Sequence, residues 1–112
     1  MHRFKAKVIV GRGRGAPIGF PTANLDKINL PLEYGVYLAV VKLDEKNYQG
    51  LMHYGPKLTF NEAVSCEIYL KNFHKNIYGR ILEVEVLEKI REVKKFINIR
   101  ALKEQIKKDL KN

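Results

Sequence analysis

The sequence is poor in the residue that builds disulfide and zinc frameworks, with one cysteine in 112 residues. A single cysteine excludes a disulfide within the chain and a zinc site made of several cysteines. We expect Cys66 to act as a small, buried apolar residue. No apolar run approaches the roughly 20 residues of a membrane-spanning helix, and Met1 to Lys5 lacks the apolar centre of a secretion signal. We therefore expect a cytoplasmic protein without a membrane partner.

Acidic residues are also scarce. The chain has 12 Asp and Glu residues against 21 Lys and Arg residues, which gives a formal net charge of +9. Such an excess favours polyanionic or phosphorylated partners. A high content of Lys, Glu and Ile is also typical of proteins from hot environments, so charge alone leaves both interpretations open. Much of the excess lies in the C-terminal third, at Lys94, Lys95, Lys103, Lys107, Lys108 and Lys111.

The hydrophobic pattern predicts a single, mainly β domain over residues 1–112. Alternating apolar and polar residues, or runs rich in β-branched and aromatic residues, predict strands over 2–10, 36–43, 48–54, 64–70 and 81–90. A polar turn at 44–47 joins two of them as a hairpin. Five or six strands at this spacing favour a small antiparallel barrel that occupies about residues 1–91.

The C-terminal segment changes period from two to about 3.6 residues, which predicts an amphipathic helix over about 98–110. Its apolar stripe is formed by Ile99, Leu102, Ile106 and Leu110, with lysines around it. Asn98 is suited to cap its first turn. We expect the helix to pack on the barrel, and one end of the barrel is a candidate position.

A glycine-rich stretch follows the first strand. Glycines allow the backbone to approach a ligand closely, and their bare N–H groups form a common cradle for phosphate oxygens. The stretch lacks the Gly-Lys-Ser/Thr ending of a Walker A loop and the spacing of a dinucleotide-binding loop. A plain glycine-rich connection accounts for the composition equally well. The residues concerned are Gly11, Gly13, Gly15 and Gly19, interspersed with Arg12 and Arg14.

Thr22 and Asn24 come directly after this stretch and Pro21. In an extended segment, residues two apart point to the same side. One hydroxyl oxygen and one amide oxygen on one side suit Mg²⁺, which takes few protein ligands and completes its shell with phosphates and water. The pair is therefore a candidate metal site.

Glu67 is the best candidate for a general base, because it is a lone carboxylate in the middle of a predicted strand. The commoner alternative is a glutamate exposed on the strand. Arg91 follows a long strand and sits among charged residues, and it either clamps a ligand or is simply solvated. His53 and His74 have no partner at ligand spacing in the sequence, and we interpret both as structural or surface residues.

Taken together, these motifs resemble the signature of riboflavin kinases of the bacterial and eukaryotic type. The resemblance is centred on the segment from Gly11 to Leu25, which contains Gly-Phe-Pro-Thr-Ala-Asn. In bacteria such a domain is commonly the C-terminal half of a bifunctional FAD synthetase. Further matches continue in register over nearly the whole chain, at Leu30-Pro31, Gly35-Val-Tyr37, Gly50 to Gly55, Glu67 to Leu70, Ile77 to Gly79, Ile90-Arg91, Lys95-Phe96, Leu102, Ile106 and Asp109.

The resemblance implies a six-stranded Greek-key barrel that transfers the γ-phosphoryl group of ATP to the 5′-hydroxyl of riboflavin, giving FMN and ADP. It implies that Thr22 and Asn24 hold Mg²⁺ and that Glu67 accepts the hydroxyl proton. We expect a monomer that binds these small molecules and no nucleic acid. The implied nucleotide-binding residues are Gly11, Gly13, Gly15, Gly19, Leu70, Asn72 and Tyr78, and the implied flavin-binding residues are Arg91, Phe96 and Leu102.

The chain departs from the family pattern in several places. Ala16-Pro17 stands where bacterial members usually carry an arginine, and Leu58-Thr59 stands where Pro-Thr is typical. The choice between ATP and CTP is therefore open. The sequence contains no nucleotidyltransferase motif, so we expect no FAD synthesis. Two alternative functions are a basic barrel that binds RNA or single-stranded DNA, and a flavin-binding protein of the same fold without catalysis.

Overall fold

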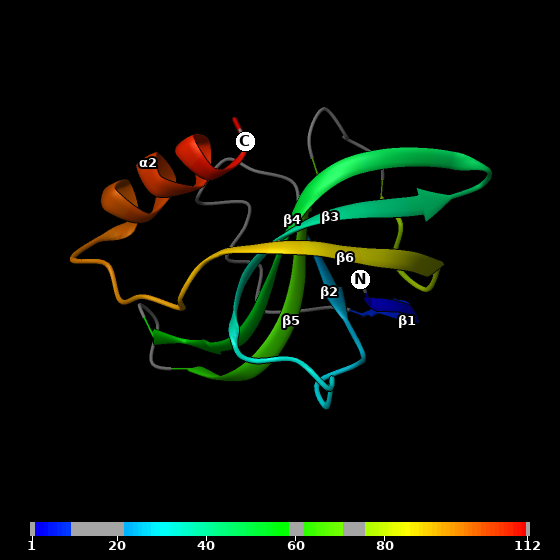
Figure 1. Ribbon diagram of the computed structural model, residues 1–112, viewed down its shortest axis with the longest axis horizontal. Coiled ribbons are helices and arrows are strands. Elements are labelled where there is room, and N and C mark those ends of the chain that lie inside the picture. Colours follow the sequence, from blue (N-terminus) through cyan, green and yellow to red (C-terminus); the bar gives the residue numbers. More distant parts are fainter. Residues whose placement is uncertain (1, 10–21, 59–61, 71–75, 112) are drawn as a thin grey trace.

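The computed structural model describes residues 2–9, 22–58, 62–70 and 76–111. Six β-strands are followed by one helix near the C-terminus (Figure 1). The elements are β1 (His2–Ile9), β2 (Thr22–Leu25), β3 (Gly35–Leu43), β4 (Lys46–Lys57), β5 (Glu62–Leu70), β6 (Ile81–Arg91) and α2 (Ile99–Asp109). The described part of the chain contains no helix that is long and apolar enough to cross a membrane.

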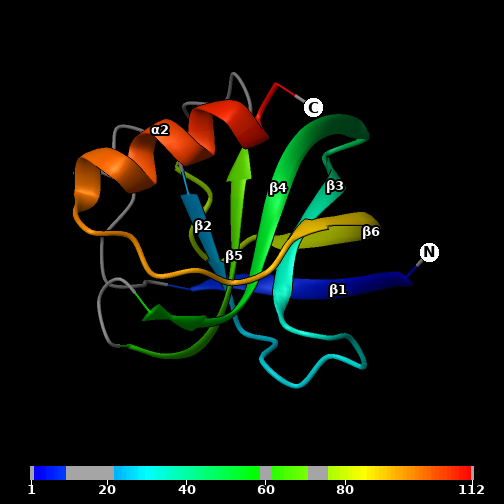
Figure 2. The same cartoon turned by 60° about the vertical axis from the view of Figure 1, so that its left-hand side comes forward.

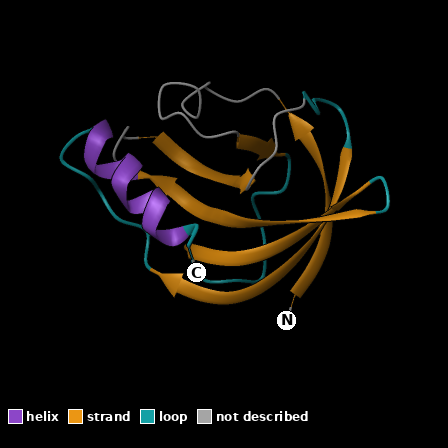
Figure 3. Cartoon of the chain, turned by 90° about the horizontal axis from the view of Figure 1, so that it is seen from above, coloured by secondary structure: helices purple, strands orange, loops and turns teal. Residues whose placement is uncertain are grey.

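The six strands form a closed barrel in the order β1-β2-β5-β4-β3-β6, and every neighbouring pair is antiparallel. Figure 3 shows the helix, in purple, beside the strands, in orange. Strands β3, β4 and β5 are consecutive neighbours, and β6 returns to lie beside β3. This is the Greek-key arrangement. The predicted fold, a six-stranded antiparallel Greek-key barrel with one C-terminal helix, is therefore confirmed.

The hairpin between β3 and β4 is tighter than the predicted turn at 44–47, because β4 already begins at Lys46. Asp44 and Glu45 alone form the turn, and both adopt positive φ angles, 52° and 69°. Two residues with positive φ match the type I′ turn, whose twist continues that of the strands. Arg80, which directly precedes β6, forms an ion pair with Asp44 of this turn.

The inward face of each strand fills the barrel, as the alternation predicts. Cys66 is 1% exposed and belongs to this core, which confirms its predicted structural role. The hydroxyl group of Tyr54 lies at the margin of the core, where it accepts a hydrogen bond from Leu30 N–H at 2.8 Å and donates one to Ile28 O at 3.0 Å. These bonds tie the connection between β2 and β3 to β4. The core includes Ala6, Val8, Ala23, Leu25, Ala39, Val41, Met52, Ile68, Leu70, Leu82, Val84 and Val86.

A second apolar cluster lies on the outer wall of the barrel, where α2 packs (Figure 1). Ile106 of the helix joins Val36, Leu51 and Tyr69, which face outward from β3, β4 and β5. The helix therefore covers the outer faces of these strands and does not enter the interior cluster, so the candidate position at a barrel end is not the one adopted. Asn98 caps the helix as predicted, since its Oδ1 accepts a hydrogen bond from Ala101 N at 2.9 Å.

Candidate active site

Strand β2 lies next to β5 in the barrel (Figure 2). Ala23 and Leu25 belong to the core, so Thr22 and Asn24 point outward on the same side, which confirms the predicted arrangement of the pair. In the antiparallel register Asn24 lies directly opposite Glu67. The candidate metal ligand and the candidate base are therefore cross-strand neighbours on one face.

Glu67 is 1% exposed, so the interpretation of Glu67 as an exposed strand residue is wrong. It faces outward between Cys66 and Ile68 of the core, but the outer wall is itself covered here. Tyr69, two residues further on the same face, is buried against the cluster that contains Ile106. A buried carboxylate is unusual unless polar groups and a function retain it, which strengthens the case for a catalytic role.

Tyr69 connects this face with the helix side of the site. It pairs with Thr22 across the strands. Burial raises the pKa of Tyr69 to about 12, while the charge of Arg91 acts in the opposite direction. The positive charge of Arg91 therefore lies close enough to Tyr69 to act on the pKa of its hydroxyl group.

Arg91 does not behave as a solvated side chain. Its Nε donates a hydrogen bond to Oδ2 of Asp109 at 2.8 Å, and the ion pair is largely buried, with 18% of the Arg91 side chain and 5% of the Asp109 side chain exposed. The other carboxylate oxygen, Oδ1, accepts a hydrogen bond from Gln105 Nε2 at 2.9 Å. The guanidinium carbon of Arg91 also lies 5.6 Å from the ring centroid of Phe96.

The structure brings the implied flavin-side residues to one region between β6 and α2. Phe96 is buried, and besides Arg91 the ammonium group of Lys94 lies 5.3 Å from its ring centroid. Leu102 packs on the outer cluster together with Ile90, the neighbour of Arg91. Arg91 and Phe96 are therefore in contact, and Leu102 lies on the outer cluster. An aromatic ring with a cation beside it suits a planar aromatic ligand.

The implied nucleotide-side residues are only partly described. Leu70 is buried in the barrel core, so its side chain is committed to packing and its backbone is what remains for a ligand. Tyr78 is 59% exposed, in a turn whose Gly79 N–H donates to Val8 O at 2.8 Å. The turn thus lies beside the end of β1. Gly11, Gly13, Gly15, Gly19 and Asn72 lie outside the described residues, as does His74.

The strand directions gather these elements at one end of the barrel. Since β1 and β2 are antiparallel, the end of β1 lies beside the start of β2, and the pair Ile9 and Asn24 marks that point. The end of β5 lies there too, because Tyr69 pairs with Thr22. Ile9 and Thr22, the described residues that flank the glycine-rich stretch in the sequence, therefore both lie at this end of the barrel.

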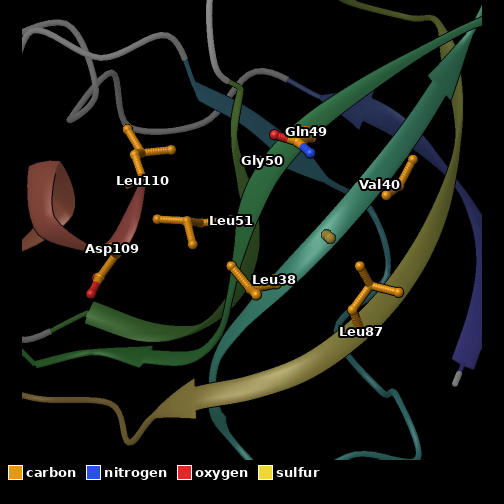
Figure 4. Close-up of a pocket in the computed structure, with 9 residues that line it drawn as sticks. Leu38, Val40, Gln49, Gly50, Leu51, Leu87, Asp109 and Leu110 are labelled. Atoms are coloured by element: carbon orange, nitrogen blue, oxygen red, sulfur yellow. The ribbon is translucent and has the colours of Figure 1, made fainter. Parts of the chain in front are cut away.

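A small cavity of about 80 Å³ lies between the outer wall and the end of α2 (Figure 4). Leu110 and Asp109 of the helix region face Leu38 and Leu51 across it, and Leu87 of β6 lies beside them. Sites for drug-sized ligands commonly measure some 300–1,000 Å³, so this cavity alone does not accommodate a flavin. It contains none of the predicted site residues, although Asp109 is the partner of Arg91.

Comparison with protein families gives one assignment for the whole chain. The family model described as "Flavokinase: Riboflavin kinase" matches residues 1–112. The chain belongs to the riboflavin kinase family. The resemblance inferred from the glycine stretch and Glu67 is thereby confirmed.

Individual riboflavin kinase relatives agree with this assignment. The chain is 39% identical over 105 residues to the RNA-binding riboflavin kinase RibR of Bacillus subtilis. This alignment covers 92% of this chain and 46% of the relative. It is 39% identical over 114 residues to the bifunctional riboflavin kinase/FMN adenylyltransferase of Haemophilus influenzae, covering 97% of this chain and 36% of the relative. The chain thus spans less than half the length of these relatives.

A solved structure has the same fold. It is titled a macrolide-efflux protein from Streptococcus pneumoniae and matches with a TM-score of 0.86 and 31% identity, over 97% of this chain and 37% of that chain. The barrel with its helix is therefore found as part of a larger chain.

Two residues of this riboflavin kinase domain gained importance only from the structure. Asp109 was matched in sequence without a role, and it proves to be the ion-pair partner of Arg91. His53, which we interpreted as structural or superficial, lies directly opposite Glu67 on β4. Gln105 and Asp109 are four residues apart on a helix, and this spacing is a weak local sign that the Asp109 side chain has a polar partner. Nothing in the sequence alone indicates that His53 lies opposite Glu67, because strand register is a long-range property.

Proposed function

We propose that this chain is a riboflavin kinase that transfers the γ-phosphoryl group of ATP to the 5′-hydroxyl of riboflavin, giving FMN and ADP. The observation that carries the proposal is the pairing of the buried carboxylate of Glu67 with Asn24, in a chain that matches the riboflavin kinase family over residues 1–112. A carboxylate next to an oxygen donor for a metal is the arrangement that phosphoryl transfer to a hydroxyl group requires.

In the proposed reaction Glu67 accepts the proton of the 5′-hydroxyl group. The ribityl oxygen forms a bond to the γ-phosphorus, and the bond from that phosphorus to the β,γ-bridging oxygen breaks, so ADP leaves with its electron pair. Burial of Glu67 favours this role, because a carboxylate packed among its neighbours is held in one orientation.

Thr22 and Asn24 offer one hydroxyl oxygen and one amide oxygen on the same outward face. These hard, neutral donors fit Mg²⁺, which completes its shell with phosphate oxygens and water. No group of three or more His, Cys, Asp or Glu side chains within the described ranges forms an alternative metal cluster. When bound, Mg²⁺ would supply stabilisation of the charge on the transferred phosphoryl group.

The two substrates approach from different sides in this proposal. The end of the barrel formed by β1, β2 and β5 would receive the nucleotide, with Gly11, Gly13, Gly15, Gly19, Leu70, Asn72 and Tyr78 as its residues. The isoalloxazine ring would lie near Arg91, Phe96 and Leu102. Arg91 occupies the same cross-strand row of the outer wall as Glu67, because Val36 pairs with Arg91 and with His53, and His53 pairs with Glu67. A ligand lying along this row would reach from the flavin side to the base.

We also propose that the protein acts as a monomer in the cytoplasm, with riboflavin, FMN, ATP and ADP as its partners.

The test is direct. Purified protein is incubated with riboflavin, Mg²⁺ and either ATP or CTP, and FMN is separated from riboflavin by chromatography. We expect FMN with ATP and none when Mg²⁺ is chelated. FMN with CTP alone would retain the reaction but change the nucleotide. Folded protein that produces no FMN with either triphosphate would overturn the proposal.

A further inference from the structure

We propose that His53 is a positioning residue that orients the carboxylate of Glu67, an inference that rests on the role proposed above for Glu67. His53 lies on β4 and Glu67 on β5, and the two are directly paired in the antiparallel register. Both point to the outer wall, because Met52 and Tyr54 on one strand and Cys66 and Ile68 on the other belong to the interior core.

The surroundings of His53 give its imidazole ring one direction for polar contact within the sheet. Its other cross-strand partner is Val36 on β3, which is buried and apolar. Its neighbours two positions away on the same face of β4 are Leu51 and Gly55. Of the four positions that adjoin His53 on this face, Glu67 alone carries a polar side chain.

The two side chains are within reach of each other. Directly opposed residues of an antiparallel pair have Cβ atoms roughly 4.5–5.5 Å apart, a separation that an imidazole and a glutamate side chain bridge with one hydrogen bond. Nδ1 of His53 and Oε1 of Glu67 are both shielded from solvent. The hydrogen bond of this proposal runs from an imidazole N–H group of His53 to the carboxylate of Glu67, in a medium where such a bond is strong.

Glu67 is thereby held between two donors. Asn24 flanks it from β2 and His53 flanks it from β4. A hydrogen bond from His53 to one carboxylate oxygen leaves the other oxygen directed at the substrate hydroxyl. His53 takes up no proton in the reaction and acts only through Glu67.

The experiment measures kcat and KM for riboflavin phosphorylation in His53→Ala, His53→Asn, Glu67→Gln and the double variant with His53→Ala and Glu67→Gln. We expect His53→Ala to lower kcat by about 10- to 100-fold, the typical effect of an orienting neighbour, with little change in KM. His53→Asn should recover most of the lost rate, since its amide also donates N–H. In the Glu67→Gln background, His53→Ala should change kcat by no more than about twofold, because the two residues act as one unit.

His2→Ala is the matched control, because His2 lies on β1 and pairs with Val86. We expect wild-type kcat for this variant, and thermal melting checks that each variant is folded. A kcat of His53→Ala equal to that of the wild type would overturn the proposal, and so would equal losses in both Glu67 backgrounds. If Glu67→Gln itself keeps full activity, the base assignment fails and the proposal about His53 fails with it.

Discussion

Arg91, the last residue of β6, and Asp109, the last residue of α2, form a buried ion pair at 2.8 Å. The pair joins the two elements at the side of the barrel where the flavin is proposed to bind. Because both ends of the pair are removed from water, each charge depends on the other for its stabilisation.

We therefore expect Asp109→Ala to destabilise the protein by about 3–5 kcal/mol, since it leaves the Arg91 charge buried without its carboxylate. Urea denaturation gives the free energy of unfolding. The matched control is Glu104→Ala, which removes the exposed contact of Glu104 with Lys107 at 3.6 Å and should cost about 0–1 kcal/mol. Similar losses in the free energy of unfolding for both variants would show that burial of the Arg91–Asp109 pair does not determine its contribution to stability.

Glu67→Gln keeps the size of the side chain and removes its ability to accept a proton. We expect kcat to fall by about 10²- to 10⁴-fold, the usual contribution of a general base, with KM values close to those of the wild type. Steady-state FMN formation provides the measurement. Glu83→Gln on the exposed face of β6 is the control and should keep full activity. Full activity in Glu67→Gln would remove Glu67 from the mechanism.

Asn24→Ala should raise the Mg²⁺ concentration needed for half-maximal rate by about tenfold to a hundredfold, corresponding to the 1.5–3 kcal/mol of a polar contact to a charged partner. The rate of FMN formation is followed as Mg²⁺ is titrated at saturating ATP. Asn47→Ala, in the exposed part of the β3–β4 hairpin, should leave the titration unchanged. An unaltered Mg²⁺ requirement in Asn24→Ala would exclude Asn24 as a ligand.

Gly50→Ala tests how closely β4 and β5 approach each other. A Cβ at Gly50 would lie 2.5 Å from the carbonyl oxygen of Tyr69, which is backbone and cannot move aside alone. We expect a loss of about 1–3 kcal/mol, the range for overpacking. At Gly35 the nearest atom is Cε of Lys89, also at 2.5 Å, but it belongs to a flexible side chain. Gly35→Ala should therefore cost less, and chemical denaturation of the two variants compares them.

Cys66 should be inert in the folded protein, because burial raises the pKa of its thiol from 9.0 to about 12. A thiol reagent at pH 8 should modify it only after denaturation. This difference makes the free energy of unfolding depend on pH, because the thiol of the unfolded chain ionises at its ordinary pKa while the thiol of the folded protein retains its proton. The contribution of this thiol to stability is thus complete below pH 9 and is lost as the pH rises towards 12. Cys66→Ser should lack that component, and rapid labelling of native protein would contradict the prediction.

The sequence allowed prediction of the elements whose pattern is local. The alternation along β1, β5 and β6, the stripe of α2 and its cap at Asn98 were all visible, because each needs only residues that are near one another in the chain. The common side of Thr22 and Asn24 was predicted for the same reason, although β2 has only four residues.

The burial of Glu67 could not be predicted from the sequence. A period of two residues separates the faces of a strand but does not say what covers each face. On β5 both faces are covered, because α2 packs against the outer wall and buries side chains there as well. Likewise, the opposition of His53 and Glu67 and the ion pair of Arg91 depend on register and helix docking. These are set by the whole barrel and not by neighbouring residues.

The closed order of the strands has a consequence for synthesis of the chain. The main partner of β1 is β6, with pairs from His2 and Val86 to Lys7 and Ile81, whereas β2 pairs with β1 at two positions among the described residues. β6 also supplies the second neighbour of β3. A ribosome-bound chain therefore carries two open strand edges until β6 has emerged. The need to protect such edges from joining other chains is greatest just before β6 closes the barrel.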